Sequence, residues 1–307
     1  MTRDNRLKNC VLALLLLLPG MECAGAGDHP LLELARERET SRDPSVRGAT
    51  DGSVAREARH QLEQAHAPED ADCAAAIGAA RFASLHRDVA AAYAAAGDMM
   101  ASAAAYRRAH ACRPRDANIL AELAGVLFDM RDLPGTRAAI TASLDIDPRS
   151  VSSNRLAGNL DFVEGRWADA IARFRYVAAS DEDRRQAGYG QLMYWLAQRR
   201  GGVPKPEFVE RTPAEGWPQP LLLFMRGEYT EAELIAPIEA GDESDNDVPN
   251  TGTDERLCEA LYYVGEEYWA RGQPEVARDY FAALVNIKVL YFLEHGLALA
   301  EIAKLRK

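Results

Sequence analysis

The sequence predicts an all-α protein assembled from helical hairpins, and three observations support this fold class. Of the 307 residues, 48% are hydrophobic and only 7% are aromatic, so the chain can bury a sizeable core without a large aromatic content. The helix-favouring residues Ala, Leu, Arg and Glu are abundant, and long β-branched runs are absent. In addition, Pro114 and Pro148 stand 34 residues apart, which indicates a repeat.

A 34-residue period is that of the tetratricopeptide repeat (TPR), a helix–turn–helix unit that stacks into a solenoid. When each proline closes a repeat, the repeats cover residues 83–116, 117–150 and 151–184. We therefore predict a TPR helical-hairpin solenoid over residues 71–200, which also include the helix that follows the third repeat.

The repeats share a packing pattern that explains why their period is fixed. A small residue recurs in the first helix, where it lets the second helix approach, and a large residue recurs in the second helix, where it fills the gap to the next repeat. The small residues are Ala90, Ala124 and Gly158, and the large ones are Tyr106, Ile140 and Phe174. Gly125 is assigned to the same packing pattern.

The C-terminal part is less regular. Residues 201–253 contain several prolines and predict an irregular middle section of short helices that ends in an acidic loop at 241–253. Residues 254–307 predict a TPR-like helix pair followed by a capping helix, which would cover the apolar end of the solenoid.

The first 26 residues have the three parts of a secretory signal peptide. Basic residues precede an apolar run at 11–18, and small residues follow it, so we expect cleavage after about Ala26 and a periplasmic or secreted protein. A membrane anchor would need about 20 apolar residues, and no transmembrane segment is expected elsewhere. Cys23 follows Glu22, which fits lipidation poorly, so a lipid anchor is not expected. Residues 27–70 predict a polar, partly disordered and loosely packed segment.

The cysteines and the charge limit the chemistry. Export would leave Cys73, Cys112 and Cys258 in an oxidising compartment. An antiparallel hairpin returns Cys112 towards Cys73, so we predict a disulfide between them and a buried Cys258. The net charge of −11 argues against nucleic acid as a partner. No motif for a metal site, a cofactor or catalysis is found, so we expect none of these.

The inner face of a TPR array is formed by the first helices of the hairpins and predicts a groove for proteins or peptides. Arg155 and Asn159 stand four apart on one helix, as in part of a clamp for a peptide carboxylate. A general peptide groove and a solvated surface are the alternatives, and the two phenylalanines fit an inter-repeat core equally well. The predicted groove residues are Arg87, Asn118, Glu122, Phe128, Arg155, Asn159 and Phe162.

The C-terminal half resembles the NlpI family, TPR proteins of the Gram-negative envelope. The resemblance is carried by the run LYYVGEEYWARG at 261–272, by FLEH at 292–295 and by YWLA at 194–197 before EGW at 215–217. It implies a homodimeric, non-catalytic adaptor that presents cell-wall hydrolases to an envelope protease. The alternative is an interaction module of an envelope polysaccharide or secretion assembly. Two departures from the family are the poor lipidation site and the longer polar N-terminal segment.

Overall fold

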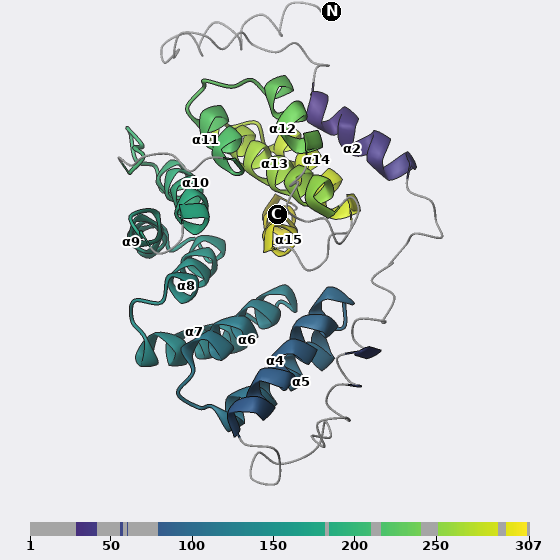
Figure 1. Cartoon of the computed structure of the whole chain (residues 1–307). Coiled ribbons are helices and arrows are strands. Elements are labelled where there is room, and N and C mark those ends of the chain that lie inside the picture. The colour runs from purple at the N-terminus through teal and green to yellow at the C-terminus, as the bar shows by residue number, and fades with distance from the viewer. Residues whose placement is uncertain are drawn as a thin grey trace, which may run out of the picture.

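The computed structural model describes residues 29–41, 56–57, 60, 79–181, 184–209, 216–240, 251–287 and 293–305. Within these residues all regular structure is helical, which confirms the all-α prediction (Figure 1). The elements are α2 (Pro30–Ser41), α4 (Ala79–Ala95), α5 (Met99–Cys112), α6 (Ala117–Asp129), α7 (Leu133–Ile146), α8 (Val151–Val163), α9 (Trp167–Ala178), α10 (Arg184–Arg200), α11 (Gln219–Met225), the 3₁₀ turn η2 (Ala232–Leu234), α12 (Ile235–Ala240), α13 (Thr251–Ala270), α14 (Pro274–Ile287) and α15 (Leu293–Leu305).

The helix bounds follow the 34-residue period. Helices α5, α7 and α9 begin at Met99, Leu133 and Trp167, each 34 residues after the one before, and α6 and α8 begin 34 residues apart. The chain has a positive φ shortly before α5, α7 and α9, at Gly97, Arg131 and Gly165. Glycine adopts this backbone conformation without steric cost, whereas the Cβ atom of Arg131 makes the conformation unfavourable there.

Polar side chains start several of these helices. Asp98, Asp116, Asp132 and Ser150 each accept a hydrogen bond from a backbone N–H in the first turn of α5, α6, α7 and α8. Such caps satisfy N–H groups that have no partner inside the helix. The sequence thus defines the helix starts locally, before any packing between hairpins.

Consecutive helices pack as hairpins: α4 with α5, α6 with α7, α8 with α9, and α13 with α14. Within the third hairpin, a Cβ added at Gly158 would lie 2.7 Å from Cε1 of Phe174, so only glycine permits this close approach. Neighbouring hairpins contact each other through α5 with α6, α7 with α8 and α6 with α8, and α9 and α8 continue into α10. Figure 1 shows the hairpins following an arc from α4 round to α14.

The C-terminal helix α15 lies inside this arc. It packs on α14 and α13, as a terminal helix should, and it also contacts α6 and α8 (Figure 1). The Nη1 atom of Arg131 donates to the Gly296 carbonyl oxygen at 3.0 Å, and a Cβ at Gly296 would stand 3.4 Å from atoms of Phe128 and Asp129. We predicted that this helix caps the end of the array, whereas it also covers part of the inner face.

The N-terminal helix α2 does not pack loosely. It lies against α14 and α13, and Leu31, Leu34 and Ala35 are buried. Its start is held by the carboxylate of Glu231, which accepts from the Leu31 N–H at 3.1 Å and from the Tyr280 hydroxyl. The expectation of loose packing is therefore wrong for residues 30–41, because an apolar stripe on α2 finds a partner far away in sequence.

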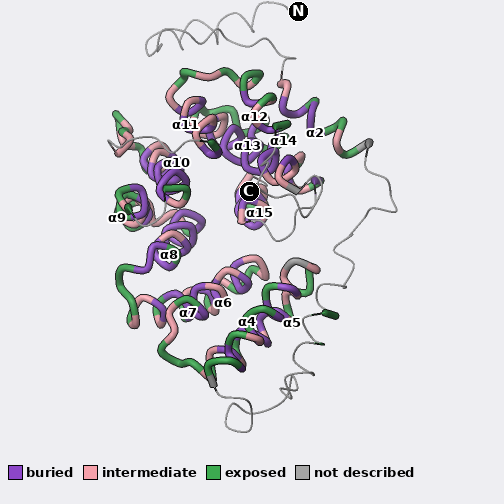
Figure 2. The backbone as a smooth tube through the Cα atoms, in the orientation of Figure 1, coloured by how far each residue is buried: buried purple, intermediate pink, exposed green. Residues whose placement is uncertain are grey.

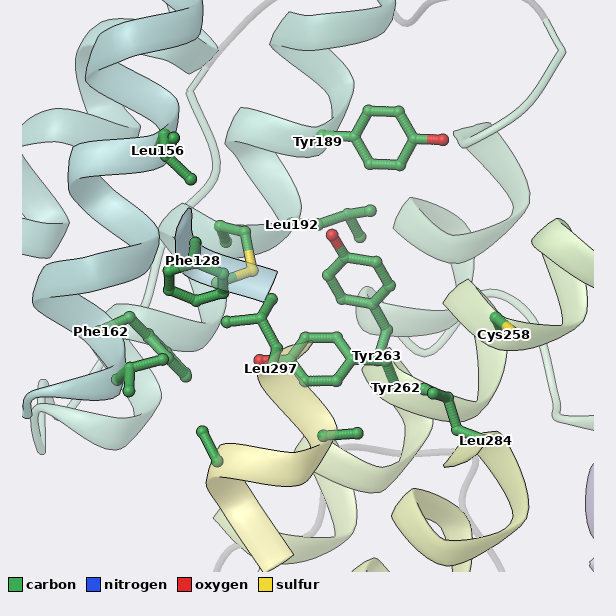
Figure 3. Packing of buried hydrophobic residues seen from close by; sticks show 14 of the residues in the cluster. Phe128, Leu156, Phe162, Tyr189, Leu192, Cys258, Tyr262, Tyr263, Leu284 and Leu297 are labelled. Atoms are coloured by element: carbon green, nitrogen blue, oxygen red, sulfur yellow. The ribbon is translucent and has the colours of Figure 1, made fainter. Parts of the chain in front are cut away.

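The core is continuous from the arc into the C-terminal part. Figure 2 shows buried residues concentrated in α8, α10 and α13, and Figure 3 shows side chains of α6, α8, α10, α13 and α15 gathered in one cluster. Helix α13 begins at Thr251, so the predicted acidic loop is shorter at its C-terminal end than expected, and residues 241–250 lie outside the described residues.

A buried arginine joins three helices in this core. Arg200 at the end of α10 has a side chain that is 9% exposed and contacts two carboxylates that are 0% exposed: Glu266 of α13 at 2.6 Å and Glu301 of α15 at 3.2 Å. Its guanidinium carbon also lies 3.9 Å from the ring centroid of Trp269. The charge is therefore paired and stacked rather than isolated.

The predicted disulfide and the predicted signal peptide both involve residues outside the described part of the chain. Cys112 is disulfide-bonded, but Cys73 lies outside the described residues, so their pairing stays a prediction. Cys258 is a buried thiol, as expected. The predicted signal peptide also lies outside the described residues. None of the helices described here has the length and apolar character that crossing a membrane requires.

Candidate functional site

The inner face of the arc contains a groove of about 470 Å³ that is lined by α4, α6, α8 and α15. Its volume falls within the range of about 300–1,000 Å³ that is usual for ligand sites. Because α15 contributes Leu293 to one wall, the groove is bounded by the chain's own C-terminal helix. This groove is the candidate site.

One face of α6 forms the floor. Asn118, Glu122, Gly125 and Asp129 all line the groove, and their spacing of four, three and four residues places them on one side of a helix. A Cβ added at Gly125 would have no neighbour within 4 Å. The expectation that Gly125 takes part in hairpin packing is therefore wrong, and the residue leaves open space in the groove.

An ion pair between Arg87 of α4 and Glu122 of α6 bounds the groove on its α4 side. The Nε atom of Arg87 donates to Glu122 Oε1 at 2.8 Å and to Oε2 at 2.7 Å, so the guanidinium meets both carboxylate oxygens. The Glu122 hydrogen bond raises the pKa of Arg87. Since Arg87 is about half exposed, the pair positions side chains more than it stabilises the fold.

At the other end, the groove meets buried carboxyl groups. Burial, together with the nearby charge of Glu294, raises the pKa of Asp129 to about 8. Burial also raises the pKa of Glu294, which accepts a hydrogen bond from Tyr263. Below pH 8 the carboxyl group of Asp129 is therefore mostly neutral.

Glu259 of α13, Asp129 and Glu294 form one carboxyl group cluster, because the charge of Glu294 acts on both of the others. The Tyr189 hydroxyl donates to both oxygens of Glu259 at 2.8 Å, and the Trp217 Nε1 atom donates as well. Burial and the charge of Glu294 raise the pKa of Glu259 to about 8. The hydrogen-bond donors and the raised pKa values of Asp129 and Glu259 together make this cluster tolerable in a buried position.

Arg155 of α8 stands between the groove and the carboxyl group cluster. It lines the groove beside Ser152 and Leu156. Its Nε atom is buried without a hydrogen-bond partner, and within the described part of the chain no carboxylate lies within salt-bridge distance of its guanidinium. The positive charge of Arg155 partly offsets the effect of burial on Glu294.

Four of the seven predicted groove residues are brought together in the groove: Arg87, Asn118, Glu122 and Arg155. The other three predictions are wrong, because Phe128, Asn159 and Phe162 are 2%, 1% and 0% exposed. Phe128 is covered by α15 near Gly296, and Phe162 packs edge-to-face on Trp167. The two phenylalanines thus take the core positions that were the alternative.

The predicted pairing of Arg155 with Asn159 in one clamp is not observed. Asn159 is buried, and neither polar atom of its amide has a hydrogen-bond partner. Arg155, one turn earlier, remains at the groove. The two side chains share a helix face, but only one of them reaches the open space.

Gly125, Asp129 and Leu293 are among the groove residues that sequence reasoning missed. The first two could have been found, because they continue the helical spacing from Asn118 and Glu122. Leu293 could not have been found, since its position depends on the contact between α15 and α6.

No protein-family model matches the chain. In the ranges that the structure describes, no three His, Cys, Asp or Glu side chains are grouped so that they could hold a metal ion. What the groove offers is charge of both signs and an apolar wall, which suits the binding of a peptide segment.

Proposed function

We propose that this chain is an exported, non-catalytic TPR scaffold that binds protein partners through the groove of its inner face. The observation that carries the proposal is the groove itself, whose polar residues come mostly from the first helices of three successive hairpins, α4, α6 and α8. A TPR assignment is supported by the helix starts, the positive-φ turns and the close approach at Gly158. Such arrays use their concave surface for binding.

The resemblance of the C-terminal half to the NlpI family supports a more specific role. In this proposal the chain is a homodimeric adaptor of the cell envelope that presents cell-wall hydrolases to a processing protease. Catalysis would then belong to the partners. The signal-peptide pattern of residues 1–26 supports the location, and the poor fit of Cys23 to lipidation argues for a protein without a lipid anchor.

Gly125 allows a direct test of the groove. Gly125→Leu would place a side chain in the open space of the groove, and nothing lies within 4 Å of its Cβ position. Replacing a glycine inside a helix is itself favourable by about 0.5–1 kcal/mol. The variant should therefore block binding without unfolding the protein, and Gly125→Ala is the matched control that leaves the groove open.

The assay is affinity capture from a cell-envelope extract with identification of the retained proteins by mass spectrometry. We expect proteases and cell-wall hydrolases to be retained by the wild type and by Gly125→Ala, and to be lost with Gly125→Leu. Retention of the same proteins by Gly125→Leu would exclude the groove as the binding site. Recovery of polysaccharide-synthesis or secretion subunits alone would refute the adaptor role and favour the alternative.

A further inference from the structure

A second cluster of polar side chains lies at the start of α2, on elements that do not line the groove. Figure 1 shows α2 beside α14, whereas the groove is formed by α4, α6, α8 and α15. His29 directly precedes α2, Glu231 directly precedes η2, and two tyrosines come from α13 and α14. We call this set the tyrosine–histidine cluster: His29, Glu231, Tyr268 and Tyr280.

The polar atoms of the cluster face one another. The His29 Nδ1 atom lies 3.2 Å from the Tyr280 hydroxyl oxygen and 3.4 Å from that of Tyr268. The Glu231 carboxylate lies 3.4 Å from the Tyr268 hydroxyl and 3.9 Å from His29 Nδ1, and it also accepts from Tyr280. Neighbouring ligands of an octahedral metal ion stand about 3 Å apart when each lies about 2.0–2.2 Å from the metal. Small side-chain rotations would therefore bring all four donors onto one ion.

The chemistry of the donors selects the kind of ion. Two phenol oxygens and one carboxylate are hard donors, and they are joined by one imidazole nitrogen, a ligand that suits iron. When both phenols are ionised, the cluster supplies three negative charges, which balance a trivalent ion. Structural zinc sites instead use cysteine and histidine. The donor set therefore fits ferric iron, and it has no spacing motif because its members lie up to 251 residues apart.

The surroundings keep the cluster protonated when no cation is bound. Burial raises the pKa of Glu231 and of the hydroxyls of Tyr268 and Tyr280. A bound cation reverses this preference, because it stabilises the ionised oxygens directly. As each oxygen–metal bond forms, the tyrosine hydroxyl loses its proton to solvent, so binding releases two protons from the two tyrosines.

The attachment of α2 needs only part of this cluster. One oxygen of Glu231 is enough to accept from the Leu31 N–H, and apolar residues of α2 supply its packing. Tyr280 is 0% exposed and the Glu231 side chain is 10% exposed, so the donors are shielded from bulk water. The His29 side chain is 24% exposed, which leaves a path from solvent to the donors.

We propose that the tyrosine–histidine cluster binds one ferric ion through His29 Nδ1, the Glu231 carboxylate and both tyrosine oxygens. Water or a small chelating anion completes the coordination. The ion ties the start of α2 to the hairpin of α13 and α14. Because the cluster lies outside the groove, this site is independent of the proposed scaffold function.

The test is a titration of the full mature chain with ferric nitrilotriacetate, followed by visible absorption. A phenolate that is bound to ferric iron gives a charge-transfer band in the visible range, which free iron chelate and free tyrosine lack. We expect a coloured complex with one iron per chain and the release of two protons in unbuffered solution. Gallium nitrilotriacetate, which is trivalent and colourless, should displace the iron, whereas zinc sulfate should not.

Variants identify the ligands. Tyr268→Phe and Tyr280→Phe keep the aromatic ring and remove one ligand oxygen each. Each should weaken iron binding at least about tenfold, since even the outer partners of metal ligands contribute this much, and should weaken the visible band. Tyr176→Phe is the matched control, because Tyr176 is a 39% exposed tyrosine of α9, and it should leave both unchanged.

Three results would each overturn the proposal: no visible band with the wild type, an unchanged iron affinity in a folded Tyr268→Phe, or displacement of the iron by zinc. Circular dichroism shows whether each variant folds. If neither cluster variant folds, His29→Ala takes their place, because it removes a ligand at a partly exposed position. Partner capture by Gly125→Leu and Gly125→Ala tests the scaffold function separately, so either proposal can fail while the other stands.

Discussion

Replacement of Arg200 by methionine should be among the most damaging single changes in the chain. Its side chain is 9% exposed, and its two partners Glu266 and Glu301 are 0% exposed. The variant would leave the buried Glu266 without its ion-pair partner, whereas Glu301 keeps Lys304 at 2.6 Å. Breaking a buried ion pair from one side costs about 3–5 kcal/mol. That is a large part of the total stability of a domain, which is about 5–15 kcal/mol. Methionine keeps the apolar stem, so packing loss is a minor part of the effect.

Urea denaturation at about pH 8, followed by circular dichroism, measures this cost. Arg199→Met is the control: Arg199 is 28% exposed, and its partner Glu267 keeps Arg271 at 2.9 Å, so a cost of about 0–1 kcal/mol is expected. A cost below about 1 kcal/mol for Arg200→Met, or equal costs for both variants, would refute the reasoning. Adding Glu266→Gln to Arg200→Met should recover part of the loss, because the unpaired charge is then removed.

Two further predictions follow from the same structure. Gly158→Ala places a Cβ 2.7 Å from the buried ring of Phe174 and should lower the free energy of unfolding by about 1–3 kcal/mol. Gly125→Ala meets no neighbour and should raise the free energy of unfolding by about 0.5–1 kcal/mol. Thermal unfolding in which both variants shift the midpoint in the same direction would contradict this packing. The folded-state pKa values of Asp129 and Glu259 are raised to about 8 from ordinary values of 3.8 and 4.5, so the folded protein binds more protons than the unfolded chain between these limits. Stability is therefore lost as the pH rises through about 8, and the free energy of unfolding in urea should be lower at about pH 8.5 than at about pH 6 by roughly 2 kcal/mol or more. A constant or rising value over that interval would show that these carboxyl groups ionise freely.

The regular part of the fold could be predicted because its causes are local. Pro114 and Pro148 mark the period, and the capping side chains of Asp116 and Ser150 start helices at the expected places. The small residue at Gly158 likewise needed only its place in the repeat. These features act over a few residues, so a single sequence is sufficient to reveal them.

The remainder depends on contacts between segments that are far apart in the sequence. Nothing near Leu293 or Gly296 shows that α15 will lie on α6, and this contact decides that Phe128 is core rather than groove. The docking of α2 was missed for the same reason, since Leu31 gains its partner Glu231 only in the folded chain. The candidate site was therefore predicted only on its α4, α6 and α8 side.

The contacts of α2 and α15 also bear on when, during synthesis, the chain can complete its fold. The His29 Nδ1 atom lies 3.2 Å from the hydroxyl oxygen of Tyr280, 251 residues away, and Arg131 reaches Gly296 across 165 residues. An ordinary repeat array can begin to fold as soon as a few units have been made. Here α2 and α15 each contact helices far away in the sequence, and such long-range contacts form slowly. Synthesis must therefore be almost finished before the contacts of α2 and α15 can form.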